Sequence, residues 1–233
     1  MRLKLSNLSL IETVDWVRSH DNGLVFCCTT NELMMAKEDS EFAKKLSSAD
    51  LLTTDGMPLV WLNRLRTGKG SRVYGPELME KFTNSKDLNP SRASRDLPLT
   101  REIKHLFVGD EKNRKFFLKH GDYVVMPMKD EFETKDYDEL AEIVKKSKAE
   151  IVWLGLGAKK QVETGYELKK RKVKKMIVTV GAAFDFLSGN KKQCPRWLRD
   201  RGGEWLYRLM TEPKRLAGRY WKNLWFLLRG NWD

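Results

Sequence analysis

Residues 151–161 read IVWLGLGAKKQ, an apolar run that ends in two glycines and leads into a polar segment. Four consecutive apolar residues indicate a strand that is buried on both faces, as in a parallel sheet. Residues 162–172 then place polar and apolar side chains with a helical period. Gly155 and Gly157 therefore mark a tight turn from a strand to a helix, the repeating unit of α/β proteins.

The rest of the chain repeats this alternation of strands and helices. Further apolar runs that predict buried strands are 24–28, 50–53, 105–108, 123–126 and 176–180. Helical periodicity is clear at 137–148, and a helix capped by Asn31 is expected to run through Leu46. The pattern predicts an α/β fold with a Rossmann-like, doubly wound and mostly parallel sheet. Residues 84–100, rich in Ser, Pro, Asp and Arg, are expected to form a surface loop.

The composition restricts the class of protein. The 233 residues include 44 Lys and Arg against 32 Asp and Glu, a net charge of +12, which favours a polyanionic partner. Three cysteines without framework or zinc spacing indicate buried thiols in a reducing compartment, and three scattered histidines argue against a histidine metal site. The N-terminus lacks the apolar run of a signal peptide, and no stretch of 18 apolar residues is present. We expect a protein that is soluble or that sits on a membrane without crossing it.

The composition changes after Gly189. Residues 196–233 contain nine basic residues against four acidic ones, and five of the eight tryptophans. This change predicts an α/β core over residues 1–193 and a helical, basic, aromatic-rich appendage over 194–233. Tryptophan and arginine together suit an anionic membrane surface. Two alternatives remain for this segment: a helix that packs its aromatic side chains on the core, and a nucleic-acid surface on which bases stack.

Ligands of open parallel sheets bind beyond the carboxyl ends of the strands, so the residues that follow each apolar run are the candidates for a site. Asp55 follows one strand, where it could act as a general base or merely cap the next helix. Gly155 and Gly157 could let the backbone approach a phosphate, or form a plain turn. Lys160 stands where a dinucleotide fingerprint needs its third glycine, which argues against NAD.

Two charged motifs need the same comparison. Arg72 could clamp a phosphate with two hydrogen bonds, or be a solvated loop arginine. Asp136 and Asp138 have the acid-x-acid spacing that some sugar transferases use to hold a metal. They also begin a predicted helix, where carboxylates are stabilised by the helix dipole, and we favour that interpretation.

Taken in order, the motifs resemble the bacterial WecG/TagA/CpsF glycosyltransferases, which build surface polysaccharides and teichoic-acid linkage units. The similarity runs from about Leu24 to Leu228. Its most specific parts are VGAAFDFLSG at 180–189, CPRW at 194–197, EWLYRL at 204–209 and EPKR at 212–215. Supporting parts are TTN at 29–31, DGMPLVW at 55–61, RVYG at 72–75 and LGLG at 154–157, which leads to Gln161.

The resemblance implies an inverting, metal-independent hexosyltransferase without a cofactor. It would move a sugar from a UDP-sugar to a polyprenyl-diphosphate-linked sugar at the inner face of the cytoplasmic membrane. It implies that Asp55 is the catalytic base and that the C-terminal arginines meet diphosphate or membrane. The positions that it assigns to the donor and acceptor pocket, together with the two turns that would admit UDP, are Thr29, Asn31, Arg72, Gly155, Gly157, Gln161 and Gly181. The C-terminal basic positions are Arg208, Arg215 and Arg219.

The sequence departs from the family pattern near the expected donor pocket. Lys159 stands in place of a proline, Val162 in place of a glutamate, and Gln193 in place of an arginine. These changes affect the identity of the donor more than the type of reaction. A nucleotide-dependent oxidoreductase and a non-enzymatic binder of RNA or membrane are the alternatives. Burial of the aromatic appendage in a homo-oligomer is a further alternative to a membrane surface.

Overall fold

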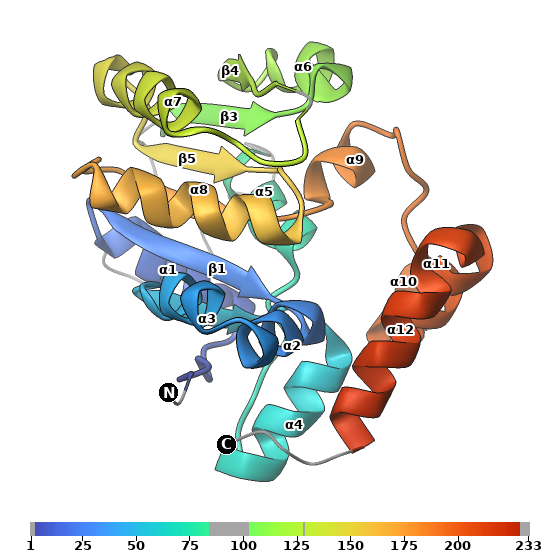
Figure 1. The fold of residues 1–233 in the computed structure, drawn as a ribbon. Helices are drawn as coiled ribbons and strands as arrows, with labels where there is room; N and C mark the ends of the chain where they lie inside the picture. The colour runs from blue at the N-terminus through green and yellow to red at the C-terminus, as the bar shows by residue number, and fades with distance from the viewer. Residues whose placement is uncertain (1–2, 84–102, 128, 229–233) are drawn as a thin grey trace, which may run out of the picture.

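A six-stranded sheet forms the centre of the molecule, and all of its strand pairs are parallel (Figure 1). The computed structural model describes residues 3–83, 103–127 and 129–228, so the loop expected at 84–100 lies outside the described residues. The strand order is β2-β1-β6-β5-β3-β4. The strands are β1 (Gly23–Cys28), β2 (Leu51–Thr54), β3 (His105–Gly109), β4 (Asp122–Val125), β5 (Ile151–Leu154) and β6 (Met176–Thr179).

The helices of the described residues follow the strands in the alternation that the sequence predicts. In the first half they are α1 (Leu10–Ser19), α2 (Thr30–Glu38), α3 (Ser40–Ser47), α4 (Met57–Thr67), α5 (Gly75–Thr83) and α6 (Glu111–Phe117). In the second half they are α7 (Thr134–Lys146), α8 (Ala158–Lys170), α9 (Ala183–Leu187), α10 (Arg196–Asp200), α11 (Glu204–Thr211) and α12 (Pro213–Leu228). The predicted α/β class and parallel sheet are confirmed.

The sheet divides the core into two apolar layers. Successive side chains of a strand point to opposite faces, so continuous apolar strands supply both layers. On β1, Leu24 and Phe26 face one layer, while Val25 and Cys27 face the other. Helices α2, α3, α7 and α8 cover the first face, and α1, α5, α6 and α9 cover the second. This double burial explains why the strands read as apolar runs without alternation.

The segment expected to form one helix from Asn31 through Leu46 forms two helices, and the first N-cap lies two residues before the expected position. Thr29 is the N-cap of α2, and its hydroxyl accepts a hydrogen bond from the backbone N–H of Asn31 at 3.2 Å. The chain then leaves the helical conformation at Asp39, whose carboxylate accepts the backbone N–H groups of Glu41 and Phe42. A second N-cap in mid-segment ends one helix and starts another, which the hydrophobic period does not reveal.

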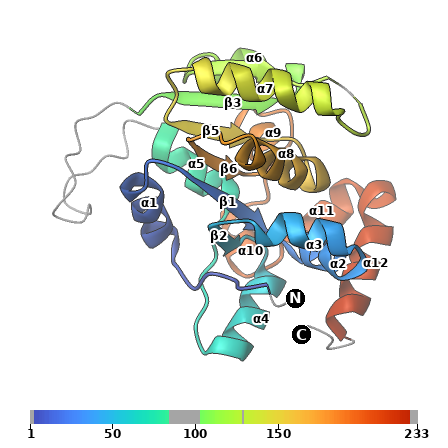
Figure 2. The ribbon, with the colours of Figure 1, turned by 60° about the vertical axis from the view of Figure 1, so that its left-hand side comes forward.

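The C-terminal segment forms α10, α11 and α12 beside the carboxyl ends of the strands. In Figure 1 the arrows of β1, β3 and β5 point toward these three helices. Figure 2 shows α12 next to α2, against which it packs. Leu216 is fully buried, so α12 is anchored on the rest of the protein. Within the described residues no helix is both long and apolar enough to cross a bilayer.

A buried histidine makes the stability of the sheet sensitive to acid. His105 Nδ1 accepts a hydrogen bond from Trp153 Nε1 at 3.2 Å, and His105 Nε2 lies 3.3 Å from the Phe82 carbonyl. Trp153 can only donate, so the histidine is neutral with its proton on Nε2. Burial lowers the pKa of His105 to about 4.

We therefore expect stability to fall as the pH drops from about 6.5, where the unfolded histidine gains a proton, to about 4, where the folded one does. The loss is about 1.4 kcal/mol per pH unit. Urea unfolding at pH 7, 6 and 5 should show that His105→Gln removes this part of the slope. His20→Gln, a change at an exposed histidine, is the control and should keep the slope. Identical slopes for the wild type and His105→Gln would contradict the assignment.

Candidate active site

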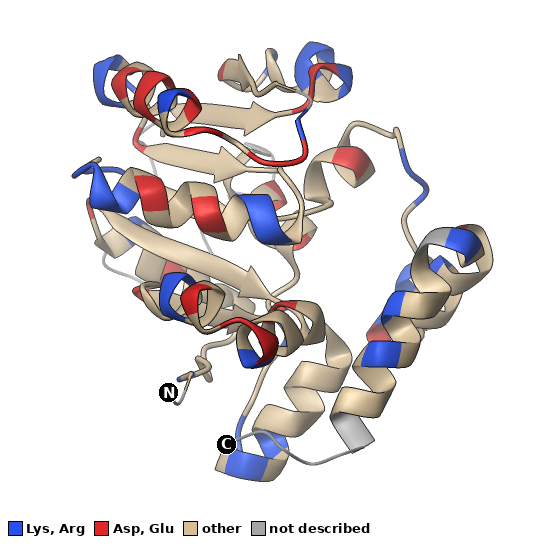
Figure 3. Ribbon diagram, in the orientation of Figure 1, with Lys and Arg blue, Asp and Glu red and all other residues tan. Residues whose placement is uncertain are grey.

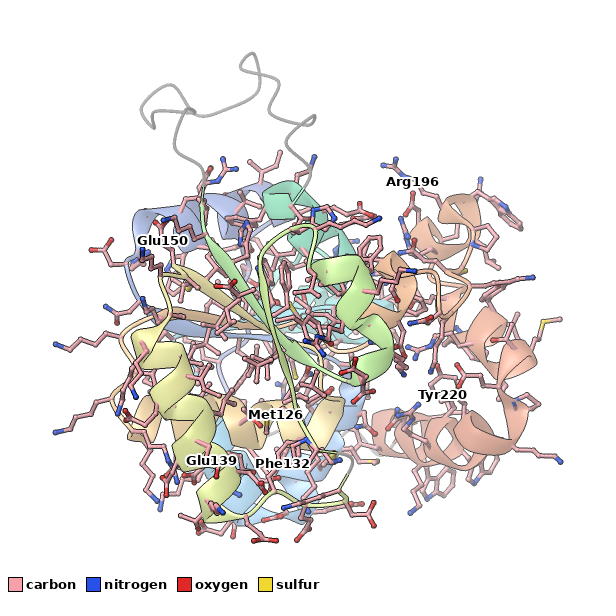
Figure 4. The ribbon with its side chains drawn as sticks, turned by 90° about the horizontal axis from the view of Figure 1, so that it is seen from above. Met126, Phe132, Glu139, Glu150, Arg196 and Tyr220 are labelled. Atoms are coloured by element: carbon pink, nitrogen blue, oxygen red, sulfur yellow. The ribbon has the colours of Figure 1, made fainter. Side chains whose placement is uncertain are left out.

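The residues that follow four neighbouring strands come together at one edge of the sheet. The strands lie in the order β2-β1-β6-β5, and all of them end at this edge. The edge therefore gathers Asp55 after β2, the Thr29–Asn31 segment after β1, Gly181 after β6 and the Gly155–Gly157 turn after β5. In Figure 4, Arg196 and Tyr220 mark the C-terminal helices on the side opposite Glu150, which precedes β5. The C-terminal helices stand at the same edge as the candidate residues.

Asp55 is held at this edge as a largely buried carboxylate. Its backbone N–H donates to the Cys28 carbonyl at 2.9 Å, and its Oδ2 accepts the backbone N–H of Gly75 at 3.4 Å. The side chain is 16% exposed. Gly56, not Asp55, is the N-cap of α4, and no side chain caps that helix. The capping alternative for Asp55 is therefore wrong, and the carboxylate has no local structural task of that kind.

The surroundings of Asp55 suit a group that exchanges protons near neutrality. Burial raises the pKa of Asp55 to about 7; Arg72 and the Gly75 N–H act in the opposite direction, while Glu204 and Glu32 raise the pKa further. A carboxyl with a pKa near the working pH can both take up and release a proton during a reaction. The geometry therefore allows Asp55 to act as a general base.

Arg72 joins the site to the C-terminal helices. Its Nε donates to the Asp55 carbonyl at 2.7 Å, one Nη contacts the Arg199 carbonyl at 3.5 Å, and the other donates to the Glu204 carboxylate. The guanidinium also stacks on the ring of Tyr74, 4.3 Å from its centroid. Arg72 is therefore not a solvated loop arginine. Its hydrogen-bonding groups are engaged with the protein itself, and a phosphate would have to share or replace these contacts.

A second arginine secures the same junction. Arg199 is 6% exposed, and one of its Nη atoms donates to Glu77 of α5 at 2.6 Å. Its guanidinium lies 4.7 Å from the centroid of the Tyr74 ring, and the Tyr74 hydroxyl accepts a hydrogen bond from Gln193 at 3.1 Å. Tyr74 thus lies between Arg72 and Arg199. The bond from Arg199 to Glu77 connects α10 to α5.

The segment after β1 holds a second buried carboxylate. Glu32 is 4% exposed and accepts both the backbone N–H of Thr29, at 2.9 Å, and the Thr29 hydroxyl. Burial raises the pKa of Glu32, while hydrogen bonds from Thr29 and the charge of Arg219 act against this shift. The Asn31 amide Nδ2 contacts Met35 Sδ at 3.4 Å. The Thr29 hydroxyl therefore donates its hydrogen bond to Glu32, so toward a ligand it can act only as an acceptor.

The two glycines of the turn after β5 have different structural reasons. A Cβ on Gly155 would lie 2.5 Å from Cγ of Phe184, so this position is small because an aromatic ring packs against it. Gly157 has φ +83°, and a Cβ there would meet nothing within 4 Å. Gly157 is the N-cap of the 13-residue helix α8, and no side chain or backbone atom crowds the space beside its Cα.

Gln161 connects the ends of β5 and β6. It is buried, its amide oxygen accepts the backbone N–H of Gly181 at 2.9 Å, and its own backbone N–H donates to the Gly157 carbonyl at 3.0 Å. The oxygen of this predicted pocket residue is therefore committed to shaping the edge of the sheet. Its amide nitrogen can still donate to a ligand, and its oxygen has one further lone pair.

The three predicted basic positions of the C-terminal helices differ in their surroundings. The Arg208 guanidinium lies 5.7 Å from the centroid of the Phe186 ring in α9, and Arg219 faces Glu32 closely enough to affect its pKa. Arg215 belongs to α12, but its side chain lies outside the described ones. Figure 3 shows further Lys and Arg along α10, α11 and α12. Arg208 and Arg219 thus turn toward the core.

The aromatic residues of these helices are not all packed on the core. Large apolar side chains that remain at least half exposed here include Trp197, Met210, Trp221 and Trp225. Leu224 is 47% exposed and lies three positions after Trp221, on the same side of α12. The structure therefore favours a surface role over burial for part of the aromatic set.

The acid-x-acid motif at Asp136 and Asp138 has local partners. Asp136 accepts the backbone N–H of Glu133 at 2.8 Å and pairs with Lys129 at 3.1 Å, while Asp138 pairs with Arg171 at 2.7 Å. The two carboxylates thus serve the start of α7 and its contact with α8, as favoured from the sequence. Among the described residues no three His, Cys, Asp or Glu side chains are grouped to hold a metal.

Sequence reasoning missed four residues of this edge: Glu32, Tyr74, Glu77 and Glu204. The T-x-x-E pattern at 29–32 is a capping box and could have identified Glu32. Glu204 lies 132 positions from Arg72, and no local pattern reveals a pair at that separation. The same holds for Arg199 and Glu77, which are 122 positions apart.

The contrast between the two glycines can be tested. Gly155→Ala should destabilise the protein by about 1–3 kcal/mol because the new methyl group meets Phe184. The double change Gly155→Ala with Phe184→Leu should recover part of that loss relative to Phe184→Leu alone. Gly157→Ala should cost about 1–3 kcal/mol, because its φ of +83° and ψ of 162° lie in a region that is essentially restricted to glycine, with no relief from Phe184→Leu. Urea unfolding measures the three single variants and the two double variants, and additive losses at 155 and 184 would contradict the packing argument.

The parallel sheet, with a buried carboxylate and an arginine at its carboxyl edge, defines an α/β protein whose ligand site lies at that edge. A sequence model of the Glycosyl transferase WecG/TagA/CpsF family matches residues 1–232. The chain belongs to this family and is a glycosyltransferase. The resemblance drawn from the sequence is confirmed, and the oxidoreductase and the non-enzymatic binder are set aside.

Two curated relatives are N-acetylglucosaminyldiphosphoundecaprenol N-acetyl-beta-D-mannosaminyltransferases. The protein of Bacillus subtilis (strain 168) is 23% identical over 229 residues, which cover 94% of this chain and 83% of the relative. That of Bacillus spizizenii (strain ATCC 23059 / NRRL B-14472 / W23) is 28% identical over 189 residues, which cover 77% and 68%. The similarity therefore extends over most of both relatives.

Proposed function

We propose that this protein transfers an N-acetylmannosamine-type sugar from a UDP-sugar to a polyprenyl-diphosphate-linked sugar, with inversion at the anomeric carbon. Support for the acceptor and the sugar comes from the names of the two relatives, which act on a diphosphoundecaprenol-linked N-acetylglucosamine. Support for the chemistry comes from Asp55, the buried carboxylate at the carboxyl edge of the sheet. This single observation carries the proposal.

The reaction needs one proton acceptor. In this mechanism the Asp55 carboxylate takes the proton of the acceptor hydroxyl, and the oxygen of that hydroxyl attacks the anomeric carbon of the donor. The bond between that carbon and the UDP oxygen breaks, and UDP leaves with the electron pair. Because attack and departure occur on opposite faces of the carbon, the configuration inverts.

The departing UDP carries growing negative charge, which the site must stabilise. The open N-terminus of α8 after Gly157 offers backbone N–H groups and a positive dipole end. The positive charge of Arg72 lies at the same edge. We propose that these groups and the C-terminal arginines act in place of a metal ion.

We further propose that the C-terminal helices rest on the inner face of the cytoplasmic membrane. A lipid-linked acceptor requires a site close to the bilayer. The exposed side chains of Trp221 and Leu224 can enter the interface, and Lys214 and Lys222 can contact anionic headgroups. The net charge of +12 favours the same surface.

The role of Asp55 is testable with one substitution and a matched control. Asp55→Asn should lower transfer from a labelled UDP-sugar roughly 10²- to 10⁴-fold because the base is lost, while UDP still binds. UDP binding is measured by thermal shift with and without EDTA, and we expect EDTA to leave it unchanged. Asp50→Asn makes the same change at the opposite end of β2 and should keep turnover. Undiminished turnover by Asp55→Asn would contradict the role of Asp55 as the base.

The membrane role is tested at the exposed face of α12. Trp221→Ser combined with Leu224→Ser should weaken binding to vesicles that contain phosphatidylglycerol about 100-fold, because removal of two apolar side chains from the interface costs roughly 3 kcal/mol. Co-sedimentation measures this binding. The control is Leu118→Ser with Ile143→Ser, which removes two other exposed apolar side chains, one at the C-cap of α6 and one in α7, and should have no effect. Equal losses in both variants would argue against a specific membrane face.

A further inference from the structure

Two carboxylates compete for the guanidinium of Arg72. One Nη of Arg72 donates to the Glu204 carboxylate, while the same nitrogen lies 3.8 Å from Asp55 Oδ1. All three side chains are largely shielded, with exposed fractions of 15–16%. The cation is therefore nearer to Glu204 in α11 than to Asp55 after β2.

We propose that Glu204 is a positioning residue of the transfer site: it holds the Arg72 cation away from Asp55 and so keeps Asp55 able to accept a proton. The inference rests on the proposed function, in which Asp55 is the base. It assigns to the C-terminal segment a task in the chemistry itself, separate from contact with a membrane or a substrate.

The balance of charge around Asp55 supports this role. The ionisable groups that interact with it are Arg72 and Tyr74 from the segment before α5, Glu204 from α11, Glu32 from α2, and the thiols of Cys27 and Cys28 from β1. Burial raises the pKa of both thiols and of the Tyr74 hydroxyl, which keeps them neutral, so one cation and two other carboxylates set the local field. A full ion pair with Arg72 would leave Asp55 ionised and weakly basic, because an adjacent cation lowers the pKa of a carboxyl.

The remaining contacts of Arg72 hold it in this shared position. Its Nε donates to the Asp55 carbonyl, and its guanidinium carbon lies over the Tyr74 ring. Because the guanidinium is planar and rigid, these two contacts restrict the direction of the Nη atom that donates to Glu204. That nitrogen points to Glu204. Without the Glu204 carboxylate, Arg72 would be free to pair with Asp55.

The chain supplies a matched control for this effect. Glu77 also binds the C-terminal segment through a buried arginine, since Arg199 donates to it at 2.6 Å. Glu77 is not one of the main groups that shift the pKa of Asp55. Glu77→Gln therefore weakens the docking of α10, while Glu204→Gln both weakens the docking and removes the charge that competes for Arg72.

The test measures the titration of Asp55 directly, by carbon NMR of protein labelled at the aspartate carboxyl carbons. The resonance of Asp55 is the one that Asp55→Asn removes. We expect Glu204→Gln to lower the Asp55 pKa by about one unit or more. We expect Glu77→Gln to change it little, and Arg72→Gln to raise it. An unchanged pKa in Glu204→Gln, or an equal fall in Glu77→Gln, would overturn the proposal. If Glu204→Gln does not fold, the Arg72→Gln and Glu204→Asp variants decide the question, with a rise and a smaller fall expected.

Kinetics give the second readout. In the wild type the acid limb of kcat should lie near pH 7, where Asp55 loses its proton. Glu204→Gln should move that limb to lower pH and reduce the plateau, because a weaker base transfers the proton less well, and Glu204→Asp should restore part of both. Loss of activity without movement of the limb would indicate a structural role. The two proposals fail separately: a wild type without transfer activity refutes the function, while the NMR titration still decides the role of Glu204.

Discussion

All six strands run in the same direction, and the position of every functional group depends on this constraint. Parallel strands require crossover helices, which bury both faces of the sheet and leave only its ends free for ligands. Residues that are more than a hundred positions apart in the chain, such as Thr29 and Gly157, therefore meet at the carboxyl edge. The same geometry leaves the edge open, and the C-terminal helices stand beside it.

The junction between the sheet and these helices is made of charged groups that are mostly withdrawn from water. A buried ion pair gains little net stability, because the loss of hydration offsets the attraction, whereas removal of one partner is strongly unfavourable. Such a junction is specific without being strong. The clusters around Arg72 and Arg199 therefore suit a segment that must dock in one orientation, and they put its charges within reach of the proposed base.

The family and the structure complement each other. Membership in the WecG/TagA/CpsF family defines a glycosyltransferase, and the curated relatives indicate the kind of sugar and acceptor. The structure adds the physical state of the individual groups. Asp55 has a pKa raised to about 7 by burial, the hydroxyl of Thr29 is bound to Glu32, and Arg72 is shared between two carboxylates. These states describe a site in which proton affinity is adjusted by neighbouring charge.

The sequence by itself determined the α/β class, the positions of six strands and the candidate edge, because apolar runs and the glycines and polar residues that follow them are local signals. The ordered motifs were enough to identify the family. Only the tertiary structure decided that Asp55 does not cap a helix, that Gly155 is small because of Phe184, and that Arg72 is bound by Glu204. The reason is physical: hydrophobic period and turn chemistry act over a few residues, whereas burial and the pairing of charges depend on which distant segments the fold brings together.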